Sequence, residues 1–290
     1  MDLVASGAVW RRGVRRWGLP LTIVRALVRV DLVTSVSALT PYVVVGGIAA
    51  MTGFILKNDL YRVEHDGLLV LAEPFGLPVY LGTLLLSVFQ AVSAAITVAR
   101  DREQGAIELL FYGPVTSQTY MVAKLGTHIV LYLWLTGLVG VCDLLFMAVT
   151  GLRFGGTVVW AVILSVGTAA AAISLALAVA AVIRRLRAVV LAVLGLTTLS
   201  IGLQVVVEVL ARVPASEFHV SPVQVMRATA LTLSAVTGWV LPFAYFNRGL
   251  SALLRGDALS YLGTLGACGA YAMAMLGAAW IGLDRTGVRR

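Results

Sequence analysis

The residues best suited to specific chemistry lie in a short polar segment, 99–118, between two apolar runs that are each long enough to cross a membrane. Arg100, Asp101, Arg102 and Glu103 are consecutive, and Glu108 follows inside an apolar stretch. Charges beside a helix-spaced apolar patch are suited to binding the surface of another protein. Periodicity alone leaves an ordinary solvated loop open as the alternative.

Local signals predict a short helix within this segment. Gly105 interrupts the polar run, and Gly113-Pro114 is a typical helix end. The apolar residues between them follow helical spacing: Ala106, Ile107, Leu109 and Leu110. Thr116 or Ser117 can then cap the next helix.

The order of these residues resembles the signature between the second and third spans of the type-2 ABC transporter permeases. The matching positions are Glu103, Gly105, Glu108, Leu109, Leu110, Pro114, Val115, Tyr120 and Lys124. In that family the segment is a cytoplasmic coupling helix that docks on the ATP-binding subunit. The resemblance therefore implies that segment 100–117 is an ATPase-coupling interface. Its interface residues are expected to be Arg102, Glu103, Gly105, Glu108, Leu109, Leu110, Pro114 and Val115. Ala106 and the bulky Phe111-Tyr112 pair depart from the family pattern.

The composition predicts the elements that must position this segment. Hydrophobic residues make up 60% of the 290 residues, charged residues make up 12%, and the mean hydropathy is +0.95. A soluble domain carries about 25% charged residues. We therefore expect an all-α, polytopic membrane protein that forms one domain over residues 1–290.

Six apolar runs have the length that a membrane span needs, about 20 residues. They are Val36–Leu56, Pro78–Ala99, Thr119–Val149, Thr157–Ile183, Ala188–Leu210 and Ala258–Leu283. A seventh run, Ala228–Phe246, is interrupted by Gly238 and Pro242, and proline removes a helical hydrogen bond.

The basic residues predict the orientation. With six spans and both termini inside, 15 of the 22 Lys and Arg residues fall on the cytoplasmic side, which follows the positive-inside rule. The net charge of +8 is thus a topology signal, and no basic soluble face for nucleic acid is predicted. We expect a multi-pass protein of the inner (plasma) membrane.

The N-terminal region 1–35 is expected on the cytoplasmic side and includes a helix in the membrane interface. Within Leu19–Thr34, Arg25 and Arg29 share a stripe, and apolar residues occupy the remainder. The arginines could then reach lipid head groups. In the permease family an elbow helix holds this position. The alternative is an extension of the first span.

The outer region 211–257 is expected to hold re-entrant helices before the last span. A full crossing by Ala228–Phe246 would move the basic C-terminus outside, so a turn back at Gly238 or Pro242 is the expectation. The letters Phe246, Arg248-Gly249, Asp257 and Tyr261 resemble the permease branch that includes gliding-motility and nitrous-oxide-reductase accessory proteins. Gly238, Pro242, Phe246 and Arg248 are candidates for an outer gate.

The energy source is expected on another polypeptide. The two lysines, Lys57 and Lys124, follow Leu56 and Ala123, so neither lies in a phosphate-binding Gly-Lys loop. We expect no cofactor and no metal on this chain, because ATP and Mg²⁺ would be bound by a partner ABC ATP-binding subunit. The other expected partners are a second permease copy or a homologous permease, and membrane lipid. The expected direction of transport is export. The chain itself is not expected to be an enzyme.

Two other classes remain as alternatives. A secondary active transporter would need ionisable residues at mid-membrane, and those in the spans are expected nearer the ends, including His128 at the cytoplasmic end, where it could reach water. A membrane-embedded enzyme or assembly factor is the other alternative. The histidines, at 65, 128 and 219, have no recognised metal or catalytic spacing.

Overall fold

The computed structural model describes residues 21–66, 74–113, 115–152, 155–212 and 222–287, and every regular element in these ranges is an α-helix. The helices are α1 (Leu21–Ser37), α2 (Thr40–Asp66), α3 (Gly76–Glu103), α4 (Ala106–Tyr112), α5 (Ser117–Thr150), α6 (Gly156–Val182), α7 (Leu186–Arg212), α8 (Pro222–Val240), α9 (Pro242–Leu254) and α10 (Ala258–Gly287). The all-α prediction is confirmed. Residues 1–20 of the predicted N-terminal region, Pro114, and Arg289-Arg290 lie outside the described residues.

Six of the described helices are long and apolar enough to cross a membrane: α2, α3, α5, α6, α7 and α10. Their candidate spans are Thr40–Arg62, Gly76–Glu103, Ser117–Thr150, Gly156–Val182, Leu186–Val207 and Ala258–Arg285. All six predicted spans are therefore confirmed as helices of membrane-crossing length, with ends shifted by a few residues. The chain has the form of a multi-pass membrane protein.

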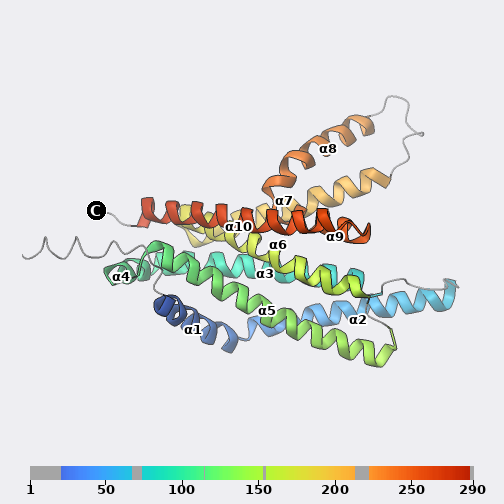
Figure 1. The fold of residues 1–290 in the computed structure, drawn as a ribbon, viewed down its shortest axis with the longest axis horizontal. Helices are drawn as coiled ribbons and strands as arrows, with labels where there is room; N and C mark the ends of the chain where they lie inside the picture. The colour runs from blue at the N-terminus through green and yellow to red at the C-terminus, as the bar shows by residue number, and fades with distance from the viewer. Residues whose placement is uncertain (1–20, 67–73, 114, 153–154, 213–221, 288–290) are drawn as a thin grey trace, which may run out of the picture.

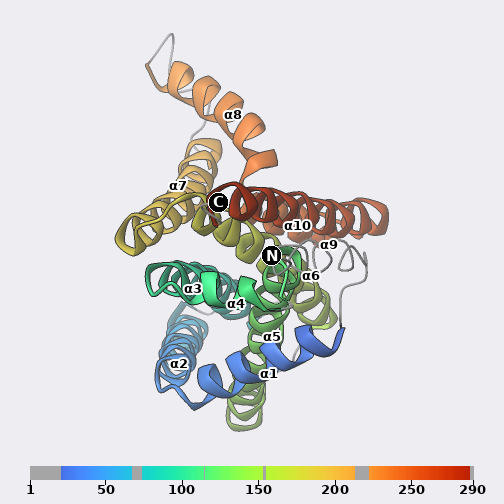
Figure 2. The same ribbon diagram turned by 90° about the vertical axis from the view of Figure 1, so that its left-hand side faces the viewer.

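Helix α6 lies at the centre of the bundle, between α3 and α10 (Figures 1 and 2). In the most apolar stretch of each helix, the buried share is 56% for α6 and 50% for α3, whereas it is only 22% for α2, α7 and α10. Small residues recur along the buried face of α6, as at Ala169, Ala172, Ala176 and Ala180. Without bulky side chains at these positions, neighbouring helices can approach closely in lipid.

Helices α8 and α9 form a bent pair. Helix α7 runs away from the α4 end, α8 returns toward the middle of the bundle, and α9 turns back beside the start of α10 (Figure 1). The two helices meet at Leu241 with a bend of 102°. Pro242 occupies the first turn of α9, where its missing N–H costs nothing. The predicted helix break thus lies next to Pro242 and three residues beyond Gly238.

The carbonyl groups at the end of α8 are bound by tyrosines. Tyr245 donates its hydroxyl hydrogen to the Trp239 carbonyl at 2.7 Å, and Tyr271 of α10 donates to the Val240 carbonyl at 2.6 Å. A broken helix at membrane depth needs such partners, because no water is present to replace the lost backbone bonds.

Candidate functional site

Helix α4 turns away from α3 at a single glycine. Gly105 has φ = 69°, a left-handed conformation that residues with a Cβ rarely adopt. The turn places the seven residues of α4 at the end of the bundle where α10 also ends (Figures 1 and 2). The predicted short helix is therefore present, and Thr116 caps α5 by accepting a hydrogen bond from the Thr119 N–H at 3.2 Å.

Helix α4 has one packed face and one exposed face. Ile107 is 2% exposed, and Leu110 and Phe111 pack against the main core. Leu109 is 73% exposed, Tyr112 is 90% exposed, and Glu108 is exposed beside them. The apolar patch expected from the sequence is therefore split between two faces, because Ile107 and Leu110 pack against this chain's own bundle while Leu109 points outward. The outward surface of α4 consists of Glu108, Leu109 and Tyr112.

Arg102 binds the end of α6. Its guanidinium donates hydrogen bonds to the carbonyls of Ala180 and Ala181 at 3.0 and 2.6 Å. The last carbonyls of a helix have no partner within the helix, and they carry the negative end of its dipole. A cation at this place stabilises the end of α6 and ties the last turn of α3 to it.

Glu103 binds the start of α7. Its Oε1 accepts a hydrogen bond from the backbone N–H of Leu186, the first residue of α7, at 2.7 Å. A carboxylate is favourable at a helix N-terminus, where N–H groups lack partners and the dipole is positive. The sequence suggested a contact with another subunit for Glu103, whereas the structure gives this exposed side chain a partner within the chain.

Asp101 binds α5 and, through Lys124, α1. It accepts a hydrogen bond from the Tyr120 hydroxyl at 2.6 Å and pairs with the Lys124 ammonium at 3.0 Å. Lys124 also pairs with Asp31 of α1 at 2.8 Å, and the lysine side chain is 8% exposed. Sequence reasoning missed both carboxylates. The one signal was that a lysine inside a long apolar helix needs an opposite charge.

Asp101, Arg102 and Glu103 are together called the α3 hub here. Its three consecutive side chains reach α5, α6 and α7, and Lys124 extends the contacts to α1. Beyond Gly105 the chain continues directly into α4. A hydrogen bond from Ser117 of α5 to Asp284 adds α10 to the helices joined at this end. A displacement of α4 would therefore be transmitted through the α3 hub to most of the helices in the bundle.

Helix α1 packs along α5 with its arginines outward. Arg25 and Arg29 are exposed, one turn apart, while Val28 and Leu32 on the other side are half-buried. Val115, a predicted interface residue, is half-buried against the main core rather than outward.

The candidate gate residues gather around the α8–α9 bend. The Arg248 guanidinium lies 4.7 Å from the centre of the Trp239 ring. A Cβ added to Gly238 would lie 2.6 Å from Nη2 of Arg248. Gly238 therefore leaves the space that Arg248 occupies. Phe246 is 5% exposed and contacts the Tyr80 ring of α3, with centroids 5.4 Å apart.

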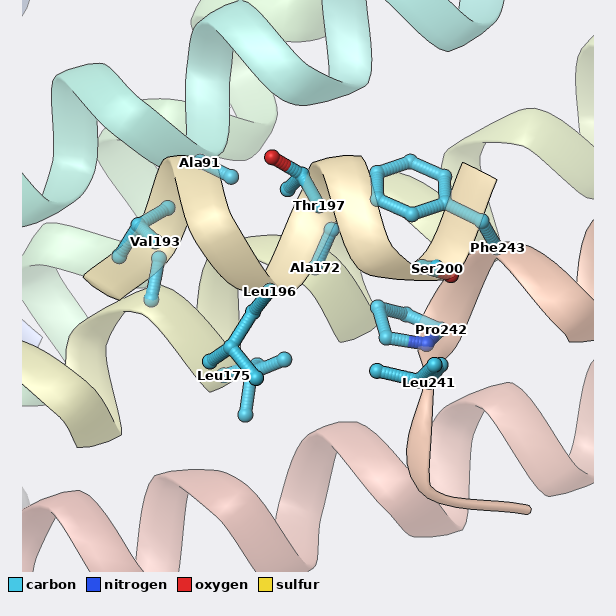
Figure 3. A pocket seen from close by; sticks show the side chains of 11 residues that line it. Ala91, Ala172, Leu175, Val193, Leu196, Thr197, Ser200, Leu241, Pro242 and Phe243 are labelled. Carbon is cyan, nitrogen blue, oxygen red and sulfur yellow. The ribbon is translucent and has the colours of Figure 1, made fainter. Parts of the chain in front are cut away.

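A cavity borders this bend, between α3, α6, α7 and the α8–α9 junction (Figure 3). Ala172, Leu175, Leu241 and Phe243 contribute apolar walls, and Ser200 lies near Pro242. The cavity measures about 10 Å³, which is room for about one water molecule. This cavity, as the described residues form it, is too small for an organic substrate.

Buried polar groups occur deeper in the bundle than the sequence suggested. The His128 Nδ1 lies 3.0 Å from Oε1 of Gln90, and these residues are 2% and 0% exposed. His128 therefore lies between α3 and α5, inside the bundle, and its side chain does not reach water. Asp143 is 3% exposed, and its Oδ1 has no hydrogen-bond partner among the described residues.

Among the described residues, no group of three or more His, Cys, Asp and Glu side chains is arranged to hold a metal ion. No protein-family model matches the chain, and no curated protein is significantly similar to it.

Proposed function

We propose that this chain is the membrane-spanning permease subunit of an ABC transporter, of the type-2 class that its 99–124 segment resembles. The observation that carries the proposal is α4 itself: a short helix between two candidate spans, with an outward surface of Glu108, Leu109 and Tyr112, adjoining the α3 hub. An exposed leucine and tyrosine beside a carboxylate are suited to a protein partner.

In this proposal α4 is the coupling helix. A separate ATP-binding subunit holds ATP and Mg²⁺ and docks on the outward surface of α4, with basic groups facing Glu108. When that subunit closes on ATP it pushes α4, and the α3 hub distributes the displacement to α5, α6, α7 and, through Lys124, α1.

The remaining parts have assigned places in the same proposal. Helix α1 is an interfacial elbow helix whose Arg25 and Arg29 reach lipid head groups. The α4 end and both termini are cytoplasmic, and the bent α8–α9 pair is a re-entrant element that gates the outer side. The substrate path forms with a second permease copy, and transport proceeds outward across the inner membrane.

The test is co-purification with the ATP-binding subunit. Glu108→Arg is expected to reduce the amount of partner retained, because the introduced cation would face basic groups. Asn58→Arg, an exposed position on α2 far from α4 in the chain and in the fold, adds the same charge and is expected to leave retention unchanged. Equal retention by both variants, or ATP turnover by the isolated chain, would refute the proposal.

One observation favours a second candidate, a proton-coupled secondary transporter. His128 and Gln90 form a buried polar pair between α3 and α5, and ionisable groups in spans are commonly functional. Substrate transport by the chain alone, driven by a pH gradient in vesicles without ATP, would favour this candidate over the first.

A further inference from the structure

A groove of about 430 Å³ separates α2 and α5 at the ends of these helices far from α4. Gly53, Lys57, Leu60 and Tyr61 line it from α2, and Phe146 and Thr150 line it from α5. This volume falls within the range of small-molecule binding sites. The groove is remote from the α3 hub and plays no part in the proposed coupling.

The groove is apolar inside and polar at one end. A Cβ on Gly53 would lie 3.2 Å from Cζ of Phe146, so the glycine lets the phenylalanine lie close to α2. Leu60 adds an apolar side chain that is 39% exposed. At the outer end of α2, Lys57 is exposed and Tyr61 is 58% exposed, with its ring stacked on His65 at 3.9 Å.

The ends of the candidate spans put the polar end of the groove near the expected membrane surface. The candidate span of α2 ends at Arg62 and that of α5 ends at Thr150. Lys57 is five residues before Arg62, about 7.5 Å along the helix. Tyrosine and lysine are typical at this depth, where an apolar stem and a polar tip are both accommodated.

We propose that the groove binds a phospholipid with an anionic head group, one acyl chain lying between α2 and α5 and the phosphate contacting the Lys57 ammonium. An apolar groove that faces hydrocarbon is filled by lipid tails, because an empty one would lose dispersion contacts. Within the part of the chain that the structure describes, Lys57 forms no ion pair with a carboxylate. An ammonium without a carboxylate partner among the described residues favours phosphatidylglycerol over a zwitterionic lipid.

The first experiment measures lipid selectivity. Purified, delipidated full-length protein is reconstituted with spin-labelled phosphatidylglycerol or phosphatidylcholine, and the immobilised fraction is titrated. Lys57→Gln is expected to lower the preference for phosphatidylglycerol about fivefold, the effect of one lysine near a membrane surface. Arg62→Gln, an exposed cation on the same helix that does not line the groove, is the matched control and is expected to keep the preference. Equal effects of the two variants, or none from Lys57→Gln, would overturn the proposal.

A second experiment identifies the occupant directly. A photoreactive benzophenone amino acid replaces Leu60, and the adduct formed in native membranes is weighed by mass spectrometry. A phospholipid adduct supports the proposal. An adduct with segment 67–73 of the same chain, or with a second copy, would overturn it. Because neither experiment uses the ATP-binding subunit, a failure here is separate from a failure of the proposed function.

Discussion

Replacing Gly249 with alanine tests how α9 is held against α6. A Cβ built on Gly249 would lie 2.5 and 2.7 Å from the two methyl carbons of Leu164, distances that force a displacement. Leu164 is fully buried, in a cluster with Phe246, Ala252 and Tyr261, and therefore has little room to yield.

The magnitude follows from two opposing effects. Adding a methyl group to a packed site costs about 1–3 kcal/mol, whereas alanine is favoured over glycine in a helix by up to about 1 kcal/mol. Gly263→Ala in α10 is the matched control, because nothing lies within 4 Å of the Cβ it would add. The difference between the two variants cancels the helix preference. Gly249→Ala is therefore expected to be less stable than Gly263→Ala by about 1–3 kcal/mol.

The assay is reversible unfolding of the purified protein in mixed micelles, with Leu164→Ala as a second substitution. Removing the colliding side chain is expected to reverse part of the effect of Gly249→Ala, so the pair would deviate from additivity by at least about 0.5 kcal/mol. If Gly249→Ala and Gly263→Ala unfold at the same denaturant fraction, close packing of α9 on α6 does not hold that region and the reasoning fails.

Three further predictions concern charged groups. Lys124→Met is expected to destabilise the protein by about 1–2 kcal/mol, less than a fully buried pair because Asp101 is 25% exposed, and adding Asp101→Asn is expected to recover part of the loss in the same unfolding assay. Asp143→Leu is expected to stabilise by about 1–3 kcal/mol, because it removes a buried carboxyl oxygen without a partner; a loss of stability would contradict that view. Asp257 accepts hydrogen bonds from the Ser260 hydroxyl and N–H, which lower its pKa below the ordinary 3.8. Because the pKa of Asp257 is lower in the folded protein, its cap on α10 is complete above pH 3.8 and is lost as the pH falls through the folded pKa. Amide exchange in the first turn of α10, corrected with peptide standards, is expected to become faster over that pH range. Asp257→Asn is expected to abolish this pH dependence.

The spans were predictable because long apolar runs separated by charge have few alternative structures in a membrane. The same holds for the helix break, since proline within an apolar run removes a backbone bond at a known place. The short helix α4 was also predictable, because Gly105 and Gly113 mark its two ends.

The partners of individual side chains were not predictable. Lys124 pairs with Asp31, 93 residues earlier in the chain. Arg102 binds backbone carbonyls of α6, which are present whatever the residue types, so the sequence carries no signal for this contact. The outward direction of Leu109 and the inward direction of Ile107 depend on how α4 leaves Gly105, which spacing within α4 does not determine.

The geometry of the α3 hub limits how the end of α3 can move. Consecutive residues of an α-helix point about 100° apart. The side chains of three residues in a row therefore contact neighbouring helices in three different directions around the axis of α3. Rotation of α3 about its own axis would break all three contacts at once, whereas movement along with its neighbours would break none. Gly105 lies two residues beyond the last of these contacts, with nothing within 4 Å of its missing Cβ. Everything on the α3 side of Gly105 is therefore expected to move as one unit with α5, α6 and α7, and a push on α4 reaches this unit through a single residue.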